Sequence, residues 1–292
     1  MDGKDDDPAP ADALAAIGNE RRIAIVYELQ RAFRDGDAAL PYAELKRRVG
    51  LRDSGNFNYH LQQLVGRFVH EHEDGYALTY AGRKVASALT AGIFTDRPDG
   101  ASVPAPGTCY ACGAASLAAR YERERVYVAC EDCGEELLHG PFPPGPATRR
   151  DDLLDAFERW TRRWNDLAAA GTCPECGSRM TATVTEASPS QCTGDASHRF
   201  RVACTECWAR ANLPPGCLVR DHPQVVDFLA TRTTDLDDRP LWDLDWALHR
   251  DYLGLVADDP VRLRLRVPGD DAELHLTFDA DATVVETSVV ER

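Results

Sequence analysis

The chain has 292 residues, enough for two to four domains, and its 43% of hydrophobic residues is ordinary for a globular protein. Its formal net charge is −15, which is unusual for a protein that binds DNA, because phosphate repels an acidic chain. No apolar run approaches the ~18–20 residues that a transmembrane helix needs, and residues 1–10 lack the basic and apolar regions of a secretory signal peptide. We therefore expect a cytoplasmic protein without a membrane anchor, in which thiols stay reduced.

The acidic composition is of a particular kind. Arginine supplies 30 of the 33 basic residues, and aspartate outnumbers glutamate by 31 to 17. This resembles proteins of halophilic archaea, whose acidic surfaces keep the fold soluble in concentrated salt; the alternative is an ordinary acidic protein. The charge is also uneven: residues 1–98 carry −2, residues 99–292 carry −13, and residues 40–68 carry +3. Electrostatic repulsion of the DNA phosphates is therefore expected to be weakest over residues 40–68.

Residues 8–98 are expected to form the first domain, with three helices, a hairpin and a last helix. Asn19 is a good N-cap for a helix through Phe33, whose buried stripe is predicted to be Ile25, Leu29 and Phe33, at a spacing of four. A short helix follows Pro41 and stops at Gly50, and a third, capped by Asp53 or Ser54, runs to Gly66.

The hairpin is expected over residues 67–79. Asp74-Gly75 is a strong two-residue turn signal between two strand-like runs. Thr79 can then cap a final helix over residues 80–91. This order of elements is that of a winged helix-turn-helix.

The third helix is the candidate for entry into a DNA major groove. Its core side is predicted to be Phe57, Leu61 and Leu64, and the opposite side carries amide and hydroxyl groups, which can pair with base edges. The predicted DNA contacts are base-facing Ser54, Asn56, Asn58, Tyr59, Gln62 and Gln63, and phosphate-facing Arg47, Arg48, Arg52 and Arg67. The alternative is an ordinary solvated helix face. His60 is expected to pack or to contact a phosphate.

Three stretches, Ile17 to Ile23, Asn56 to Leu61 and Leu78 to Gly82, resemble ArsR-like winged-helix transcriptional regulators in a haloarchaeal form. The resemblance covers about the first third of the chain. It implies a homodimer that binds double-stranded DNA with two such helices one turn apart. Metal-sensing relatives carry cysteines in this domain, but the first cysteine here is Cys109, so the resemblance does not extend to an arsenite-type sensor site.

Residues 97–107 read as a linker, and ten cysteines follow it. Eight form four Cys-x-x-Cys pairs, and two such pairs supply the four thiolates of a structural zinc site. The predicted ligands of two Zn²⁺ ions are Cys109, Cys112, Cys130 and Cys133 for the first, and Cys173, Cys176, Cys204 and Cys207 for the second. Disulfides and redox-active thiols are the alternatives, which a reducing cytosol and the duplicated spacing disfavour.

The cysteine region is an internal repeat. Residues 128–133 match residues 202–207, and a Pro-Pro-Gly turn and a helical stretch follow each match. We expect two zinc ribbons with strands over 120–128, 180–185 and 198–202, in domains spanning 105–170 and 171–234. Cys192 and Cys217 lie outside the repeat and are interpreted as small structural residues rather than regulatory thiols.

The acidic tail, residues 235–292, is expected to form a three-stranded β-meander over 261–267, 273–278 and 283–290. Trp242 and Trp246 precede it, four residues apart, and are expected to pack in a core. The predicted fold class is thus α+β and multidomain. No phosphate loop, His-Glu-x-x-His or Gly-x-Ser-x-Gly motif is present, and a zinc ion with four thiolates cannot activate water.

The leading hypothesis is therefore a sequence-specific transcription regulator rather than an enzyme. The alternative is a scaffold whose zinc ribbons contact the transcription machinery without sequence-specific DNA binding.

Overall fold

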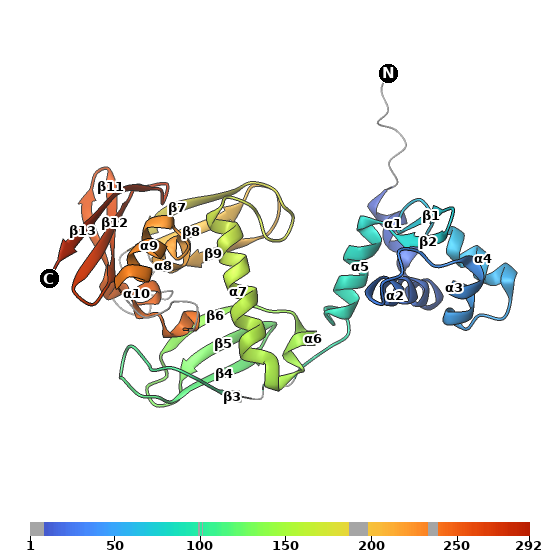
Figure 1. Cartoon of the computed structure of the whole chain (residues 1–292), viewed down its shortest axis with the longest axis horizontal. Helices are drawn as coiled ribbons and strands as arrows, with labels where there is room; N and C mark the ends of the chain where they lie inside the picture. The colour runs from blue at the N-terminus through green and yellow to red at the C-terminus, as the bar shows by residue number, and fades with distance from the viewer. Residues whose placement is uncertain (1–8, 99, 101, 187–197, 233–238) are drawn as a thin grey trace, which may run out of the picture. The chain divides into compact units, whose positions relative to one another are not determined.

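The computed structural model describes residues 9–98, 100, 102–186, 198–232 and 239–292 (Figure 1). The chain divides into two compact units, one ending at Asp96 and the other beginning at Arg97. Both mix helices with small antiparallel sheets. No helix within the described residues combines the length and apolarity needed to span a bilayer.

The first unit contains five helices and one hairpin among its described residues. They are α1 (Pro10–Ile17), α2 (Glu20–Arg34), α3 (Tyr42–Val49), α4 (Ser54–Gln62), β1 (Val69–His72), β2 (Gly75–Leu78) and α5 (Tyr80–Thr90). The predicted order from α2 to α5 is confirmed. Helix α1 was not predicted from the sequence. It begins at Pro10, where a backbone N–H would have no hydrogen-bond partner within the helix, so the missing N–H of proline is tolerated.

Local capping explains where these helices begin. The side chain of Asn19 accepts a hydrogen bond of 3.0 Å from Arg21 N at the start of α2. Asp53 accepts from Gly55 N at 2.8 Å, and Thr79 accepts from Gly82 N at 3.0 Å. Gly50 ends α3 in the left-handed conformation, with φ of 77°. Each cap satisfies a backbone group that the helix itself leaves unpaired.

The core of this unit joins all its helices to the hairpin. Ile25, Leu29, Phe57, Leu61 and Leu64 are buried as predicted, but Phe33 is 58% exposed. The prediction for Phe33 was wrong: Ala32 is the last buried residue of α2, and the exposed ring of Phe33 lies under the guanidinium of Arg83, 5.1 Å from the ring centroid. The hairpin turn also differs: His72 pairs with Gly75, so the loop residues are Glu73 and Asp74.

The second unit begins with the first ribbon. Its sheet is β3 (Ser102–Ala105), β4 (Leu117–Glu122), β5 (Arg125–Cys130) and β6 (Glu136–Pro141), followed by α6 (Pro144–Ala147), the 3₁₀ turn η1 (Arg150–Asp152) and α7 (Leu153–Ala169). The predicted linker is therefore partly wrong, because β3 lies within it and pairs with β4. The single strand expected over 120–128 is a β4–β5 hairpin that turns at Arg123 and Glu124, both with positive φ.

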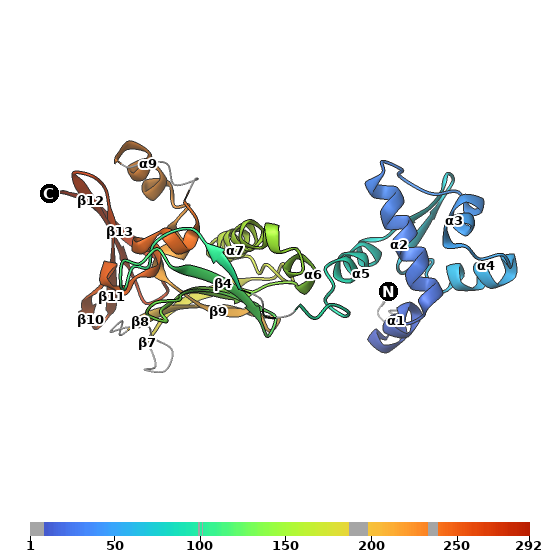
Figure 2. The same cartoon turned by 90° about the horizontal axis from the view of Figure 1, so that it is seen from below.

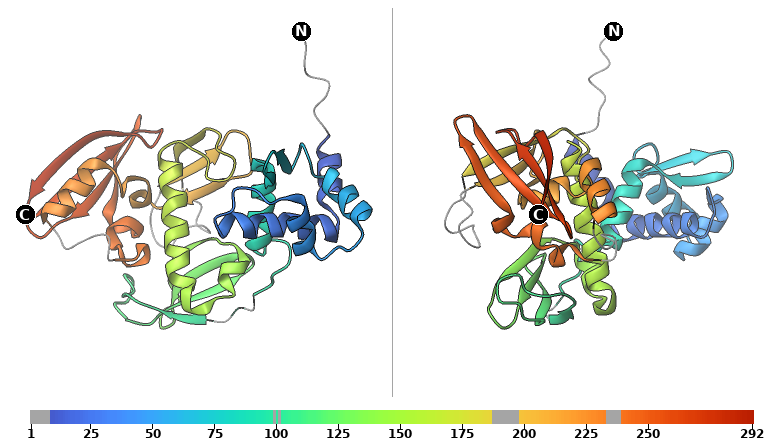
Figure 3. Two further views of the ribbon diagram at one scale, coloured as in Figure 1. Left: turned by 45° about the vertical axis from the view of Figure 1, so that its right-hand side comes forward. Right: turned by 60° about the vertical axis from the view of Figure 1, so that its left-hand side comes forward.

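The second ribbon repeats this plan with fewer strands. Its sheet is β7 (Met180–Glu186), β8 (His198–Cys204) and β9 (Arg210–Leu213), followed by α8 (Pro215–Val219) and α9 (Pro223–Arg232). The long helix α7 runs between the two ribbon sheets (Figures 1 and 3). Its buried Phe157 packs edge-to-face on Phe142 of the first ribbon, with ring centroids 5.8 Å apart.

The tail forms a four-stranded sheet rather than the predicted three-stranded meander. After η3 (Leu241–Asp243), α10 (Asp245–Leu248) and η4 (Arg250–Tyr252) come β10 (Leu253–Asp258), β11 (Val261–Pro268), β12 (Ala272–Phe278) and β13 (Val284–Glu291), paired in that order (Figure 2). The missed strand β10 is exposed along most of its length and has no alternating apolar pattern to reveal it.

One hydrophobic core runs through the whole second unit. It includes Leu117 and Val128 from the first ribbon, Phe200 from the second, and Phe278 from the tail. Phe200 and Phe278 pack with ring centroids 4.9 Å apart. Trp242 and Trp246 are buried, as predicted. The two ribbons and the tail therefore share apolar side chains that none of them buries alone.

Candidate metal centres and nucleic-acid interface

Helix α4 presents most of the predicted base-facing residues to solvent. Ser54, Asn58, Tyr59, Gln62 and Gln63 are exposed, with Tyr59 at 59%. Phe57, Leu61 and Leu64 are fully buried and fix the rotation of the helix. Since no acidic residue lies within α4, this surface offers amide and hydroxyl groups free of negative charge.

Asn56 departs from that prediction. It is half-buried, and its side-chain oxygen accepts a hydrogen bond from Arg21 Nη1 of α2. Buried His60 widens the buried stripe of α4 toward Asn56, which places Asn56 at the edge of the exposed side. Desolvation, helped by Arg21 and Arg22, lowers the pKa of His60, in keeping with a packing role.

The arginines around α4 fall into two groups. Arg52 is exposed, and Arg67 is half-buried. Arg47 and Arg48 both bind Glu44, through N–O distances of 2.7 Å, and these hydrogen bonds lower the pKa of Glu44 to about 2. Arg47 and Arg48 were predicted to contact phosphates, but their positive charges are partly neutralised by Glu44 within α3.

Two basic side chains near α4 were not among the predicted contacts. Arg21 reaches Asn56, and Lys46 Nζ donates a hydrogen bond of 2.5 Å to Ser54 Oγ. Arg21 lies 35 residues before Asn56 in the chain, so helical spacing gave no signal for it. Lys46 was counted only in the local charge. Together they extend the positive border of α4 on two sides.

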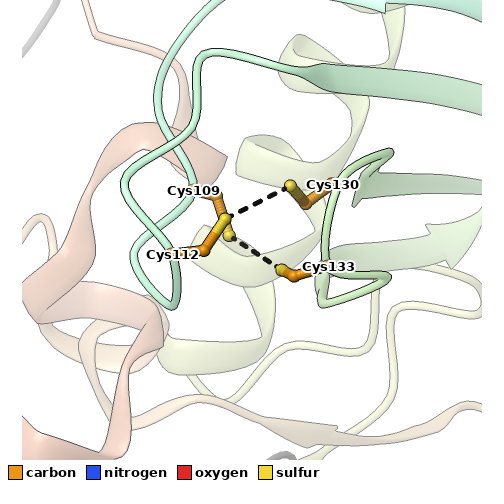
Figure 4. A group of neighbouring side chains, drawn as sticks. All are labelled: Cys109, Cys112, Cys130 and Cys133. Atoms are coloured by element: carbon orange, nitrogen blue, oxygen red, sulfur yellow. Dashed lines mark hydrogen bonds between the residues drawn. The ribbon is translucent and has the colours of Figure 1, made fainter.

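The first metal centre joins two loops of the first ribbon. Cys109 and Cys112 precede β4, and Cys130 and Cys133 lie at the end of β5 and just beyond it (Figure 4). The Sγ atoms of Cys109 and Cys133 are 3.7 Å apart, as are those of Cys112 and Cys130. All four sulfur atoms lie within 4.8 Å of one another.

The second centre has the same plan. Cys173 and Cys176 precede β7, Cys204 ends β8, and Cys207 lies just beyond it. The sulfur pairs Cys173–Cys207 and Cys176–Cys204 are both separated by 3.6 Å. Both groups of four thus match the grouping predicted from the sequence, and each can hold one metal ion.

The sulfur distances fit metal binding and exclude disulfides. Four thiolates at about 2.3 Å from a tetrahedral ion lie about 3.8 Å apart, whereas a disulfide needs about 2.05 Å. Gly113, Gly134 and Gly177 follow three of the pairs with φ between 76° and 79°, so their N–H groups turn back to the first cysteine carbonyl, at 2.7 to 3.0 Å. Each arrangement is consistent with a zinc ribbon.

The fourth pair closes differently. Trp208 occupies the position after Cys207 and does not share the positive φ of the three glycines. The N–H groups of Glu206 and Cys207 still point to Cys204 Sγ, at 3.3 and 3.4 Å, as the corresponding N–H groups do toward Cys109 and Cys130 in the first ribbon. The side chain of Trp208 is 71% exposed, and no role was predicted for it from the sequence.

Comparison with known families places this whole region in one family. The family described as a domain of unknown function, DUF7351, matches residues 106–284, which is more than half of the chain. The chain belongs to the DUF7351 family. A second domain of unknown function, DUF7347, matches residues 10–89. No curated protein matches the chain.

The DUF7351 match covers both four-cysteine groups and most of the tail sheet. It therefore coincides with the part of the chain that shares one core. Cys217 of this DUF7351 region is buried in α8, and burial raises the pKa of its thiol to about 12, which agrees with a structural role. Cys192 lies outside the described residues.

Proposed function

We propose that the protein is a sequence-specific regulator of transcription that binds double-stranded DNA through a winged helix-turn-helix in its first unit. Helix α4 is the recognition helix, and the β1–β2 hairpin is the wing. The exposed side of α4 carries the proposal, because Asn58, Tyr59, Gln62 and Gln63 offer base-pairing groups without an acidic neighbour on that helix.

The surrounding charge supports this role. In a chain of net charge −15, α4 is bordered by Arg21, Lys46 and Arg52. Cationic side chains beside a recognition helix hold the phosphate backbone and fix the register of the helix in the groove. The exposed wing residues His70 and His72 would reach the adjacent backbone.

The DNA-bound form is proposed to be a homodimer. The first unit exposes apolar side chains outside α4, among them Leu14 on α1 and Ile93 and Phe94 after α5. A two-fold pairing would cover such side chains and place two α4 helices one DNA turn apart. Sedimentation should return twice the chain mass, and Phe94→Glu should lower it toward the monomer.

The proposed metal in both four-cysteine groups is zinc, in a structural role. Four thiolates complete its tetrahedral coordination and leave no position for water. The DUF7351 region would then use zinc to hold the loops that its core does not bury.

Selection of duplexes from a random pool at high potassium concentration tests the DNA-binding proposal. The wild-type protein is expected to enrich a defined sequence, with two half-sites if it acts as a dimer. The double variant Tyr59→Ala, Gln62→Ala should lose this enrichment, because it removes base contacts from exposed positions that do not support the core.

Tyr80→Ala is the matched control, since Tyr80 is an equally large exposed side chain outside α4. It should enrich the same sequence as the wild type. If the wild-type protein enriches no sequence, the proposal is wrong and the scaffold function is favoured.

A further inference from the structure

The second ribbon has one sheet face that points away from the core. In β7 to β9, Phe200, Val202 and Leu213 are buried, so the residues that alternate with them face outward. The pairing register aligns Thr183, Arg201 and Asn212 in one row across the sheet. The outward residues are Thr181, Thr183, Thr185, Arg199, Arg201, Ala203, Arg210 and Asn212, which we call the arginine face.

The arginine face has no negative charge of its own. Arg199, Arg201 and Arg210 make no ion pair within the described residues, and the other outward side chains are neutral. It therefore carries +3, while residues 99–292 as a whole carry −13. A surface free of acid is unexpected there unless it meets an anionic partner.

The first ribbon shows what the same sheet looks like when its charges are balanced. Its central outward row is Arg120, Tyr127 and His139. Arg120 stacks over the Tyr127 ring at 5.0 Å and pairs with Glu122, and His139 pairs with Glu136.

The register of the two sheets relates these positions one to one. Glu122 of the first ribbon corresponds to Thr185 of the second, and Glu136 corresponds to Arg210. Repetition of one fold thus gives a self-neutralised face in the first ribbon and a cationic face in the second. The fold itself does not require these three arginines.

An exposed aromatic side chain lies at the edge of the arginine face. Trp208 stands two residues before Arg210, where the other Cys-x-x-Cys loops have glycine. It is 71% exposed, whereas Trp242 and Trp246 are buried. Leaving an indole in water forfeits the hydrophobic gain of burying it, and an exposed indole two residues before a cationic strand offers a stacking platform for a nucleobase.

We propose that the arginine face and Trp208 bind single-stranded nucleic acid. Arg199, Arg201 and Arg210 contact successive phosphates, and the indole of Trp208 stacks on an unpaired base. A duplex would satisfy the arginines but would keep its bases stacked inside, away from Trp208. This inference is independent of the DNA-binding role proposed for α4.

Fluorescence anisotropy with a labelled deoxyoligonucleotide of about 15 nucleotides tests the proposal on the full, zinc-loaded chain. Affinity should fall with salt, with a slope of about −0.7 per phosphate contact. The double variant Arg201→Ala, Arg210→Ala should reduce this slope by about 1.4. Both side chains are exposed, so the variant should keep its two metal ions.

Trp208 supplies a second readout. Binding of the single strand should quench its fluorescence. Trp208→Ala should weaken binding about tenfold, whereas Trp208→Phe should retain most of the affinity because it keeps an aromatic face. Metal content of each variant is measured alongside, since Trp208 adjoins Cys207.

Arg120→Ala is the matched control from the first ribbon and should bind like the wild type. The α4 double variant should also keep single-strand binding, which separates this inference from the proposed regulator function. Absence of single-strand binding by the wild type, an unchanged salt slope in the arginine variant, or equal affinity for a duplex that quenches no tryptophan would each overturn the inference.

Discussion

The indole Nε1 of Trp242 donates a hydrogen bond of 2.8 Å to the carbonyl oxygen of Pro106, 136 residues earlier in the chain. The neighbouring Asp243 accepts from Thr108 N at 3.2 Å. These two bonds attach the segment before the first metal loop to the segment that precedes the tail sheet. They make the tail a structural part of the first ribbon.

Trp242→Phe is expected to destabilise the second unit by about 2 kcal/mol, because it removes the hydrogen bond to Pro106 and opens a cavity where the buried indole lay. Denaturant unfolding at high potassium concentration, followed by circular dichroism, measures the change. Trp208→Phe replaces an exposed tryptophan in the same unit and should leave the midpoint unchanged. Equal midpoints for Trp242→Phe and the wild type would contradict the role given to this bond.

Metal content should be about two ions per chain, one for each group of four cysteines. Cys176→Ser should lower it to about one, and Cys217→Ser should leave it at two, because Cys217 lies outside both groups. Plasma emission spectroscopy on dialysed protein gives the number and identifies the metal. A wild-type value near zero would rule out both metal centres.

Loss of the second metal should also weaken the first ribbon, since the ribbons share one core. Hydrogen exchange on Cys176→Ser should show faster exchange in both ribbon sheets. Exchange in α2 to α5 should remain unchanged, because the first unit has a separate core. Protection lost only in β7 to β9 would show that the ribbons fold independently.

Glu44→Gln should strengthen duplex binding severalfold, because it releases Arg47 and Arg48 for phosphate contact and removes a negative charge near α4. Its salt slope should become steeper. The matched control is Glu122→Gln, which removes an acid from an ion pair in the first ribbon. If Glu44→Gln binds duplex no better than the control does, Arg47 and Arg48 are not phosphate contacts.

Asp166 should make stability depend on pH near neutrality. Partial desolvation and a hydrogen bond with Asp221 raise the pKa of Asp166 from 3.8 to about 7, although Arg220 and Arg162 act in the opposite direction. Between pH 3.8 and about 7, Asp166 is protonated in the folded state but ionised in the unfolded chain. The free energy of unfolding therefore declines as the pH rises toward 7, and this loss is complete above pH 7.

Asp166→Asn should therefore become more stable relative to the wild type as the pH is raised from about 6 to about 8. The effect should be modest, because Asp166 is an exposed residue. Thermal unfolding at several pH values measures it. Asp155→Asn, an exposed carboxylate on the same helix, is the control, and an identical pH trend in both variants would exclude Asp166 as the cause.

Local signals in the sequence identified most of the helices and the metal ligands. Asn19, Asp53 and Thr79 cap helices by bonds within three residues, so the sequence alone revealed them. The eight cysteines were grouped correctly because the Cys-x-x-Cys spacing and the repeat are both visible in the sequence. Strands β3 and β10 were missed because their backbone partners, not their side-chain patterns, hold them in place.

The sequence by itself determined the order of elements from α2 to α5, the two four-cysteine groups and the buried side of α4, because each depends on spacing along a few turns or one loop. Only the tertiary structure decided that Arg21 restrains Asn56, that both ribbons and the tail share a core, and that the second ribbon has an unpaired cationic face. These features join residues tens of positions apart, and their contacts follow from packing and strand register rather than from local pattern.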